Sequence, residues 1–492
     1  MNLAKKLYTS ASAKPDKVAV FYGDTTVSYG KIVNQSAHIA RILKDIYQVK
    51  KGDRIGLLIR NRPEFIPALF GIFFADCVVV PINNFMKPYE ISYIIGDAGI
   101  NVLITEEQMH AVVHKVSSMQ NNLKILKIGG QFEGLSEDIS IPETTANEQD
   151  LAIIIYTSGT TAHPKGAMLT HYNLLHNVSS CYEALDLTED DRFAVILPMF
   201  HSFMLTVGVL LPLFSSASIL IIKSIHPIKC LFDDIIQWKA TLLPAMPQVF
   251  RAFIHPSVPK ELPLRLCVSG SAPLPVDTLE HFNKKFSFPL IEGYGLSEAS
   301  PVCAVNPIKG PWKAGSIGKP LPRVELSVQD DDGNFLDHGV VGEICVRGGN
   351  VMRGYWNMPE ETAKTFRNGW LLTGDVGYMD KDGYFYITDR KKDMLLVNGN
   401  NVYPREIEEV ILRFPGVKEA AVIGRPDTRR GEQPVAYISL NEGDTISIDA
   451  LIKFMREYLA DYKVPKRIIV LTELPHNATG KILKTELRTR ND

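Results

Sequence analysis

Short apolar runs alternate with segments of helical periodicity from the start of the chain to about residue 300. Apolar runs of this length, bounded by turn-forming residues, are typical of buried strands. Their alternation with helices predicts parallel sheets covered by helices, an α/β architecture of layered subdomains. The runs predicted as strands are Ile55–Ile59, Val78–Val80, Val102–Ile104, Leu151–Ile155, Phe193–Leu197, Ser218–Ile222 and Leu264–Val268.

The pattern changes between about residues 311 and 390. Short predicted strands follow one another here, separated by turn signals at Asp330–Asn334, Asn368-Gly369 and Asp380–Gly383. This spacing is typical of hairpins in a small β-barrel or an antiparallel sheet. The aspartate clusters lack the spacing of a calcium-binding EF-hand loop, so we interpret them as turns.

A third pattern begins after the charged run Thr388–Asp393. Pro404 suits the first position of a helix, and apolar residues then follow at helical spacing. We therefore predict a large N-terminal domain, residues 1–390, and a small α+β C-terminal domain, residues 393–492, with the boundary at 391–393. The C-terminal elements predicted are a helix from Pro404 to about 414, strands at about 419–424 and 434–440, a helix at 449–460 and a strand at 467–471.

Composition and charge narrow the class of protein. A chain of 492 residues is too long for one core of the usual size, and 45% apolar residues is ordinary for a globular protein. Lys and Arg total 53 against 55 Asp and Glu, which gives no electrostatic case for a nucleic-acid partner. The six cysteines form no Cys-x-x-Cys pair, so packed free thiols are expected, not disulfides or a zinc site.

No secretory or membrane-spanning segment is expected. Met1–Tyr8 has no apolar core of signal-peptide length. The uncharged stretch Phe203–Ile222 is long enough to cross a bilayer, but Pro212 and three serines interrupt it. A helix at about 203–214 and a buried strand at about 217–222 explain this stretch better. We expect a cytoplasmic protein, and peripheral contact with a membrane stays open.

The segment Tyr156–Gly166 has the chemistry of a polyphosphate-binding loop. It follows a predicted strand and combines small hydroxyl residues, two glycines and Lys165. Backbone N–H groups in such a loop can converge on an anion, while hydroxyls and the lysine add donors and charge. The loop is not a Walker loop, because Gly166 and not Ser or Thr follows Lys165. A plain polar turn is the alternative interpretation.

This segment resembles the signature of the adenylate-forming superfamily, which includes acyl-CoA ligases, peptide-synthetase adenylation domains and beetle luciferases. The resemblance continues through five ordered motifs over essentially the whole chain. Ala162 departs from the family, which usually has glycine there, and alanine is less tolerant of positive φ. The ATP phosphates would be bound by Thr157, Ser158, Gly159, Thr160, Thr161, Lys165 and, from a later motif, Ser297.

Two further segments resemble the family's nucleotide-binding motifs. In Ile291–Glu298, the resemblance implies that Tyr294 stacks on adenine and that Glu298 holds Mg²⁺ beside the phosphates. Ser269–Pro273 is similar to the adenine-edge loop, and it would place Ser271, which replaces a glycine, and Ala272 at the base.

Asp375 and Arg390 resemble the family's ribose-binding pair. A carboxylate can accept hydrogen bonds from both ribose hydroxyls, and an arginine can donate to them. Without the other motifs, Asp375 could equally be a turn aspartate.

Lys481, in Asn477–Lys481, resembles the lysine that binds the carboxylate and the α-phosphate during adenylation. An ammonium there would stabilise a highly anionic transition state. His201 matches the family's Phe-His motif, where the imidazole flanks the acyl carboxylate; a packed histidine is the alternative. Lys392 would be the hinge that rotates the C-terminal domain, and Gly399 would then let the pantetheine of coenzyme A pass close to the backbone.

The family's reaction has two steps. A carboxylate and MgATP give an acyl-adenylate and pyrophosphate, and the thiol of coenzyme A then displaces AMP. No Asp or Glu occurs from Leu197 to Ile222, where an amino-acid-activating enzyme would place an aspartate. Leu396 stands where luciferases and coumarate ligases often have lysine, which weakens the case for luminescence or an aryl acid.

The strings Gly293–Pro301 and Asn368–Lys392 look most like bacterial long-chain fatty-acid–CoA ligases. We therefore expect a medium- to long-chain fatty acid, with the uncharged Phe203–Leu213 either lining its tunnel or forming plain core. The alternatives are an acyl-AMP ligase that loads a carrier protein, a ligase for an aryl acid, and a non-catalytic nucleotide-binding relative. The chain keeps the charged residues of these motifs, which argues against a non-catalytic nucleotide-binding relative. The oligomeric state stays open between monomer and homodimer.

Overall fold

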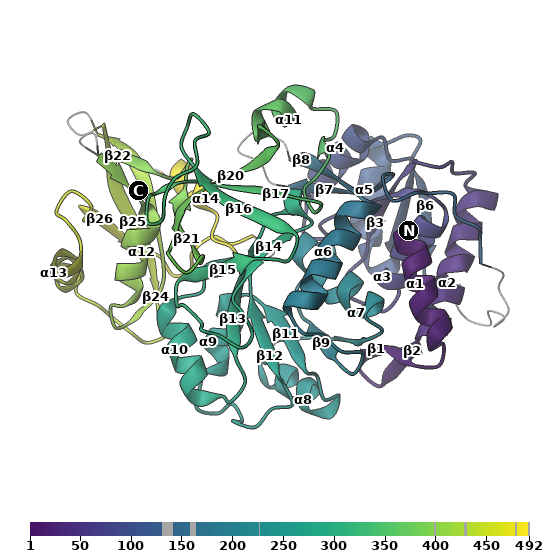
Figure 1. Ribbon diagram of the computed structural model, residues 1–492, viewed down its shortest axis with the longest axis horizontal. Helices are drawn as coiled ribbons and strands as arrows, with labels where there is room; N and C mark the ends of the chain where they lie inside the picture. The colour runs from purple at the N-terminus through teal and green to yellow at the C-terminus, as the bar shows by residue number, and fades with distance from the viewer. Residues whose placement is uncertain are drawn as a thin grey trace.

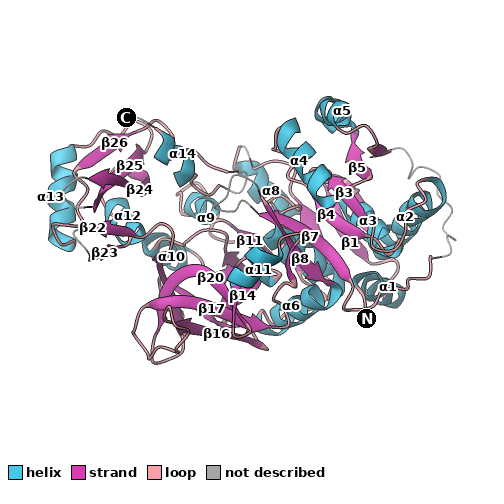
Figure 2. Cartoon of the chain, turned by 90° about the horizontal axis from the view of Figure 1, so that it is seen from above, coloured by secondary structure: helices cyan, strands magenta, loops and turns pink. Residues whose placement is uncertain are grey.

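The structure is a computed structural model that describes residues 1–129, 141–157, 164–225, 227–397, 400–427, 431–477 and 480–490. The chain forms two large sheets with their helices and a separate five-stranded sheet near the C-terminus. Figures 1 and 2 show this last sheet standing apart, at the left of both views, from the larger N-terminal part. The predicted α/β class, with a large N-terminal part and a smaller C-terminal one, is confirmed.

The seven-stranded sheet carries the phosphate-loop segment at one of its strands. Its first five strands along the chain pair in parallel, because helices return the chain across the sheet between them. β8 then runs antiparallel to β7, and β18 antiparallel to β8. In sheet order the strands are β18 (Gly354–Tyr355), β8 (Lys165–Thr170), β7 (Leu151–Thr157), β4 (Val78–Pro81), β3 (Arg54–Leu58), β5 (Val102–Glu106) and β6 (Lys124–Ile128).

The second large sheet changes from parallel to antiparallel along its width. The parallel part carries the strands that precede the adenine-edge loop and the Ile291–Glu298 motif. In order they are β1 (Val18–Tyr22), β10 (Ser218–Ile221), β9 (Arg192–Val195), β11 (Leu242–Ala245), β12 (Leu266–Ser269) and β13 (Leu290–Gly295), with β2 (Thr25–Ser28) at the edge.

The antiparallel part contains the region predicted as a small barrel, and it has a core of its own around Ile317, Val328, Ile344 and Phe385. Its turns at Asp330 and Asp380 form as predicted, since each carboxylate accepts hydrogen bonds from backbone N–H groups two and four residues on. The strands are β14 (Val302–Val305), β15 (Ser316–Pro320), β21 (Phe385–Arg390), β20 (Trp370–Met379), β17 (Gly342–Gly348) and β16 (Val324–Gln329).

The largest core joins the two big sheets through the helices between them. Gly71 on α3 (Phe65–Phe74) lets α2 (Tyr29–Arg41) approach closely, because a Cβ there would lie 2.6 Å from Ile39 Cγ2. All six cysteines are free, and five of them are buried, as expected for packed thiols. The other helices named below are α6 (His171–Ala184), α9 (Pro247–Phe253) and α10 (Val276–Lys285).

The uncharged stretch after His201 is core. Met204–Leu210 forms a π-helix, η4, which continues into α7 (Leu211–Phe214), and every residue of both is buried. β10 follows, so the predicted helix and strand are confirmed, although the π geometry of the helix was not predicted. Within the described ranges, no helix has the length and apolar character needed to cross a membrane.

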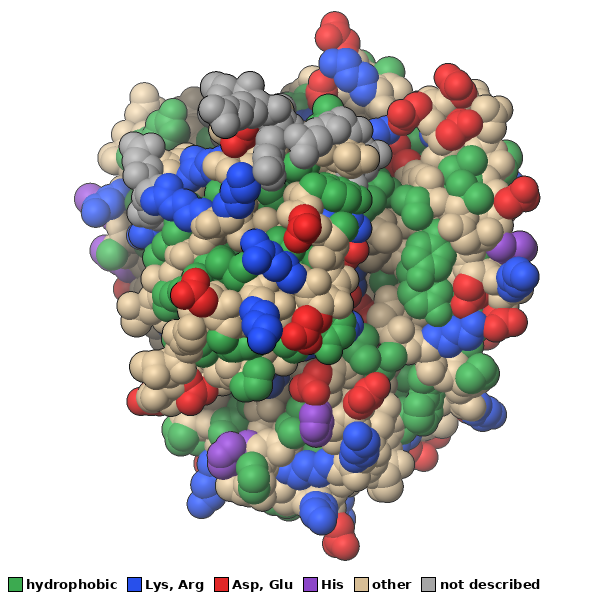
Figure 3. All heavy atoms as spheres, turned by 90° about the vertical axis from the view of Figure 1, so that its left-hand side faces the viewer, with side chains coloured by type: hydrophobic (Ala, Val, Ile, Leu, Met, Phe, Trp, Pro, Cys, Tyr) green, Lys and Arg blue, Asp and Glu red, His purple; other side chains and the backbone are tan. Residues whose placement is uncertain are grey.

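The C-terminal sheet has a core of its own, which includes Val397, Ile407, Ala436, Leu451 and Met455. Figure 3 views the molecule from this side, where acidic and basic side chains are interspersed. The elements are β22 (Leu395–Val397), β23 (Asn400–Val402), α12 (Pro404–Leu412), β24 (Val417–Asp427), β25 (Gly431–Leu440), α13 (Ile448–Tyr458), β26 (Arg467–Val470) and α14 (Lys484–Thr489).

Candidate active site

Asp375 and Arg390 face each other as paired residues of β20 and β21. Asp375 is buried, and its Oδ1 lies 2.9 Å from Arg390 Nε. Its other oxygen, Oδ2, accepts a 2.6 Å hydrogen bond from the hydroxyl of Tyr294. Asp375 raises the pKa of Arg390, and burial together with Asp375 raises that of Tyr294. The predicted ribose-binding pair and Tyr294, predicted to stack on adenine, therefore form one cluster.

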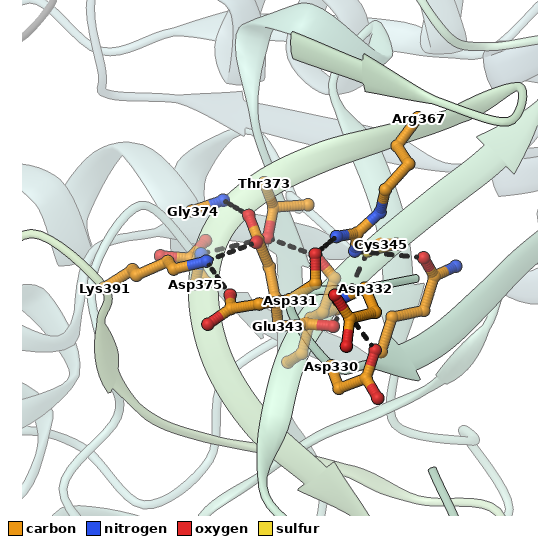
Figure 4. A network of polar contacts seen from close by, with 12 residues as sticks. Asp330, Asp331, Asp332, Glu343, Cys345, Arg367, Thr373, Gly374, Asp375 and Lys391 are labelled. Carbon is orange, nitrogen blue, oxygen red and sulfur yellow. Dashed lines mark hydrogen bonds and ion pairs between the residues drawn. The ribbon is translucent and has the colours of Figure 1, made fainter. Parts of the chain in front are cut away.

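The part of β20 that carries Asp375 is fixed by the network in Figure 4. Glu343 Oε1 accepts a 3.0 Å hydrogen bond from the backbone N–H of Gly374, and Glu343 Oε2 pairs with Lys391 at 3.2 Å. The Thr373 hydroxyl accepts from Asp375 N at 3.0 Å. A buried carboxylate and a strand-end lysine thus hold the backbone on which the predicted ribose ligand sits.

The adenine-edge loop leaves β12 at Ser269 and keeps the shape that a glycine would give it. Ser271 has φ of 68°, the left-handed conformation that glycine adopts most readily. Leu274 N at the end of the loop donates a 3.1 Å hydrogen bond to Glu292 Oε1, and burial raises the pKa of Glu292 to about 7. Ala272, which lies between Ser271 and Leu274 in this loop, is half-buried.

The Phe-His segment lies against both nucleotide motifs. Ser202 Oγ is 2.9 Å from Ser297 Oγ, the predicted phosphate ligand. Phe203 packs under the adenine-edge loop, where a Cβ on Gly270 would lie only 3.1 Å from the Phe203 ring. The predicted acid-binding segment therefore lies beside the predicted phosphate and base sites.

His201 is neutral at physiological pH. Burial lowers its pKa to about 4. Its Nδ1 accepts a 3.3 Å hydrogen bond from Phe203 N, which assigns the proton of the neutral ring to Nε2. A neutral imidazole of this tautomer can donate one hydrogen bond to an oxygen atom.

Lys165 and Glu298 are joined through Tyr355, a residue that sequence reasoning missed. β18 pairs with β8, so Tyr355 lies one strand from Lys165, and the Lys165 ammonium is 5.3 Å from the centre of the Tyr355 ring. The hydroxyl of Tyr355 donates a 2.8 Å hydrogen bond to Glu298 Oε1. Lys165 also forms a 2.6 Å ion pair with Glu361, which the sequence likewise gave no reason to select.

Lys481, from the C-terminal domain, lies near Asp375 and Arg390. The backbone beside it is docked on the N-terminal domain, since Gln248 Nε2 donates a 3.1 Å hydrogen bond to Gly480 O and a Cβ on Gly480 would lie 2.7 Å from Met246 Sδ. Partial removal from water and the nearby Arg390 lower the pKa of Lys481 to about 8, although the residue keeps a solvent-exposed side. Lys481 is therefore an ammonium that loses its proton more easily than usual.

The remaining predicted residues differ in what the structure describes of them. Thr157 is the last residue of β7 and lies opposite Lys165 on β8, and Lys392 lies in the turn after β21. The predicted phosphate ligands Ser158, Gly159, Thr160 and Thr161, and the predicted coenzyme A contact Gly399, fall outside the described residues.

The donor set fits magnesium bound together with phosphate. Glu298 supplies a carboxylate oriented by Tyr355, and Mg²⁺ in nucleotide sites takes one or two carboxylates while phosphate oxygens and water complete its shell. Glu298 would hold the ion, and Lys165 and Ser297 lie near enough to meet the phosphates beside it.

Residues 7–356 match the model of the AMP-binding enzyme family, and residues 406–481 match that of the AMP-binding enzyme C-terminal domain. The chain belongs to the AMP-binding enzyme family. This AMP-binding enzyme is 35% identical to a long-chain-fatty-acid–CoA ligase of Bacillus subtilis, over 98% of its own length and 93% of the relative's. It is also 34% identical to a feruloyl-CoA synthase of Amycolatopsis, over 98% and 97% of the two chains.

Solved structures of the AMP-binding family match over the full chain. ATP-bound MatB from Rhodopseudomonas palustris has a TM-score of 0.91 at 32% identity and covers 99% of this chain and 98% of its own. The apo structure of MatB, with the same identity and coverage, has a TM-score of 0.81. The overall arrangement of this AMP-binding enzyme is therefore closer to the ATP-bound form of that relative.

Proposed function

We propose that the protein is an AMP-forming acid–thiol ligase that activates a fatty acid with ATP and transfers the acyl group to coenzyme A. The observation that carries the proposal is the docking of the Lys481 segment, which belongs to the C-terminal domain, on the N-terminal domain: Gln248 Nε2 donates a 3.1 Å hydrogen bond to Gly480 O, the residue before Lys481. Arg390 and Asp375 are near enough to influence the pKa of Lys481 in opposite directions. An ammonium beside a ribose-binding pair suits attack of a carboxylate on the α-phosphate of ATP.

Each described motif residue has a role in the adenylation step. Asp375 and Arg390 bind the ribose, and Tyr294 stacks on adenine with its hydroxyl held by Asp375. Neutral His201 donates from Nε2 to the substrate carboxylate and orients it. Lys481 offsets the negative charge that accumulates as the carboxylate oxygen bonds to phosphorus and pyrophosphate leaves. Glu298 would hold magnesium, which would supply neutralisation of phosphate charge.

Two observations support a fatty acid as the substrate. Long-chain-fatty-acid–CoA ligases of several bacteria are 32–35% identical to the chain over at least 97% of its length. The segment from Leu197 to Ile222 also lacks any carboxylate that could pair with an amino group of a substrate. Acyl transfer to coenzyme A would follow rotation of the C-terminal domain about Lys392, which brings Gly399 to the site.

A second candidate substrate is an aryl acid. The feruloyl-CoA synthase relative is almost as similar as the fatty-acid ligases, and the anthranilate CoA ligase AuaEII in complex with anthranoyl-AMP has a TM-score of 0.91 at 29% identity. The buried, uncharged segment that follows His201 suits either acid, so only direct competition between the two classes distinguishes them.

The test of the reaction is product formation from palmitate and MgATP with and without coenzyme A. We expect pyrophosphate release without coenzyme A to stop after about one turnover, and continuous AMP release with it. An acyl-AMP ligase that loads a carrier protein would form acyl-adenylate but show no turnover with coenzyme A. A protein that binds ATP but releases no pyrophosphate with any acid would be a non-catalytic relative.

A further inference from the structure

Lys165 is already paired with an anion of the protein itself. Its side chain is only 13% exposed, and its Nζ lies 2.6 Å from Glu361 Oε2, a residue of α11 (Pro359–Thr365) that is 196 positions further along the chain. The second oxygen of Glu361, Oε1, lies 3.0 Å from Lys364 Nζ. Glu361 therefore bridges two ammonium groups, one at the predicted phosphate site and one on its own helix.

The fold builds this contact through a strand and the first turn of a helix. β18 pairs with β8, the strand of Lys165, and Trp356 N donates a 2.8 Å hydrogen bond to Gly166 O. Thr362 on α11 accepts a 2.9 Å hydrogen bond from Tyr355 N, and its hydroxyl donates to Met358 O at 2.8 Å. The helix is thus fixed to the strand beside Lys165, and Glu361 is directed at the lysine by the backbone.

We propose that Glu361 is a positioning residue that occupies Lys165 until the phosphates of the nucleotide displace it. The inference rests on the proposed function, since it assumes that Lys165 meets the phosphates of ATP. A carboxylate oxygen and a phosphate oxygen make the same charge-assisted contact with an ammonium, so the two anions compete for Lys165. Glu361 keeps Lys364 as a partner after displacement, which makes its release from Lys165 less costly.

The charges of the neighbouring groups support this exchange. Lys165 and Lys364 lower the pKa of Glu361 to about 2, so the carboxylate is ionised throughout the physiological range. The ring of Tyr355 contacts Lys165 from another side and does not compete for it as an anion would. Glu361 is therefore the group whose charge opposes arrival of the polyphosphate at Lys165.

The test is calorimetric binding of MgATP and of adenosine to the full-length protein, without an acid substrate, for wild type, Glu361→Gln and Glu360→Gln. Glu360 is the matched control, because it is the adjacent acid in the first turn of α11 and is exposed. We expect Glu361→Gln to bind ATP about two- to five-fold more tightly, the scale of a partly exposed ion pair. Adenosine affinity should be unchanged, and Glu360→Gln should resemble wild type.

A double variant, Lys165→Ala with Glu361→Gln, separates competition from a general effect on the helix. In the Lys165→Ala background, Glu361→Gln should leave ATP affinity unchanged. The proposal is overturned if Glu361→Gln binds ATP no more tightly than wild type, tightens adenosine equally, or keeps its effect without Lys165. Failure of wild type to bind ATP at all would instead contradict the proposed function.

Discussion

Lys391 and Asp393 are separated by one residue and pair with opposite domains. Lys391 Nζ lies 3.2 Å from Glu343 Oε2, and Lys391 N donates a 2.8 Å hydrogen bond to Gly374 O, both in the antiparallel part of the N-terminal domain. Asp393 Oδ1 lies 2.6 Å from Arg488 Nη2 on α14. Lys392 lies between a residue bound to the N-terminal domain and a residue bound to the C-terminal domain, which is the position expected of a hinge.

Lys392→Pro should therefore separate the two half-reactions. Proline fixes φ near −65° and restricts the residue before it, which opposes a large dihedral change at this position. We expect single-turnover pyrophosphate release from palmitate and ATP to persist, while thioester formation from the adenylate and coenzyme A falls steeply. Rapid-quench measurement of both half-reactions checks this.

Lys392→Ala is the matched control for the hinge, because it removes the ammonium and keeps the backbone free. It should support both half-reactions. If the folded proline variant retained both half-reactions, or lost both equally, the hinge would lie elsewhere or would not exist.

Lys481→Ala should impair adenylation alone. Loss of one preorganised charge partner costs at least about 10²-fold in the rate of a step that develops negative charge. Conversion of supplied palmitoyl-adenylate and coenzyme A to thioester should stay near the wild-type rate, because that step follows rotation of Lys481 away from the site. Equal losses of rate in the two half-reactions would contradict the assignment of Lys481 to adenylation alone.

The efficiency of adenylation should decrease at alkaline pH. Lys481 has a pKa lowered to about 8, so the ammonium is present below that pH and is lost as pH rises through it. Since kcat/KM reports groups of the free enzyme, kcat/KM for the acid should decline above about pH 8. Lys481→Arg, which stays charged, should abolish that decline even if its maximal rate is lower. An unchanged alkaline limb in this variant would assign the titration to another group.

Tyr355→Phe should weaken the binding of MgATP without unfolding the protein. The substitution keeps the ring beside Lys165 and removes the hydroxyl that donates to Glu298. A hydrogen bond to a charged group contributes about 1.5–3 kcal/mol, so we expect KM for MgATP to rise by about ten-fold or more. Tyr172→Phe, a change at an exposed tyrosine on α6, is the control. A Tyr355→Phe enzyme with unaltered MgATP kinetics would show that Glu298 needs no such support.

Local pattern predicted the elements, and motif strings predicted most of the site. The apolar runs before residue 300 became strands within a few residues of their expected bounds, because buried strands need continuous apolar sequence. Tyr355 and Glu361 could not be found in this way. Their place beside Lys165 depends on β18 joining β8 across 186 positions of sequence, a pairing that no local pattern encodes.

Three further features could not be predicted from local sequence. Glu292 stands in a recognised motif, yet its contact with Leu274 N follows only from the neighbouring positions of β12 and β13. Ser271 adopts a positive φ, a conformation that a serine does not by itself predict, although the related motif usually has glycine at this position. The π-helix after Phe203 has no sequence signature beyond its apolar character.

The most direct test of the central claim is a panel of acids in a coenzyme A-dependent AMP-release assay. The panel contains fatty acids from octanoate to palmitate, together with benzoate, ferulate and an amino acid. Each buried methylene contributes up to about 0.8 kcal/mol, so kcat/KM should rise by up to about four-fold per CH₂ until the site is full. The account predicts that a fatty acid gives the highest kcat/KM, and a higher value for benzoate, ferulate or the amino acid than for every fatty acid would contradict it.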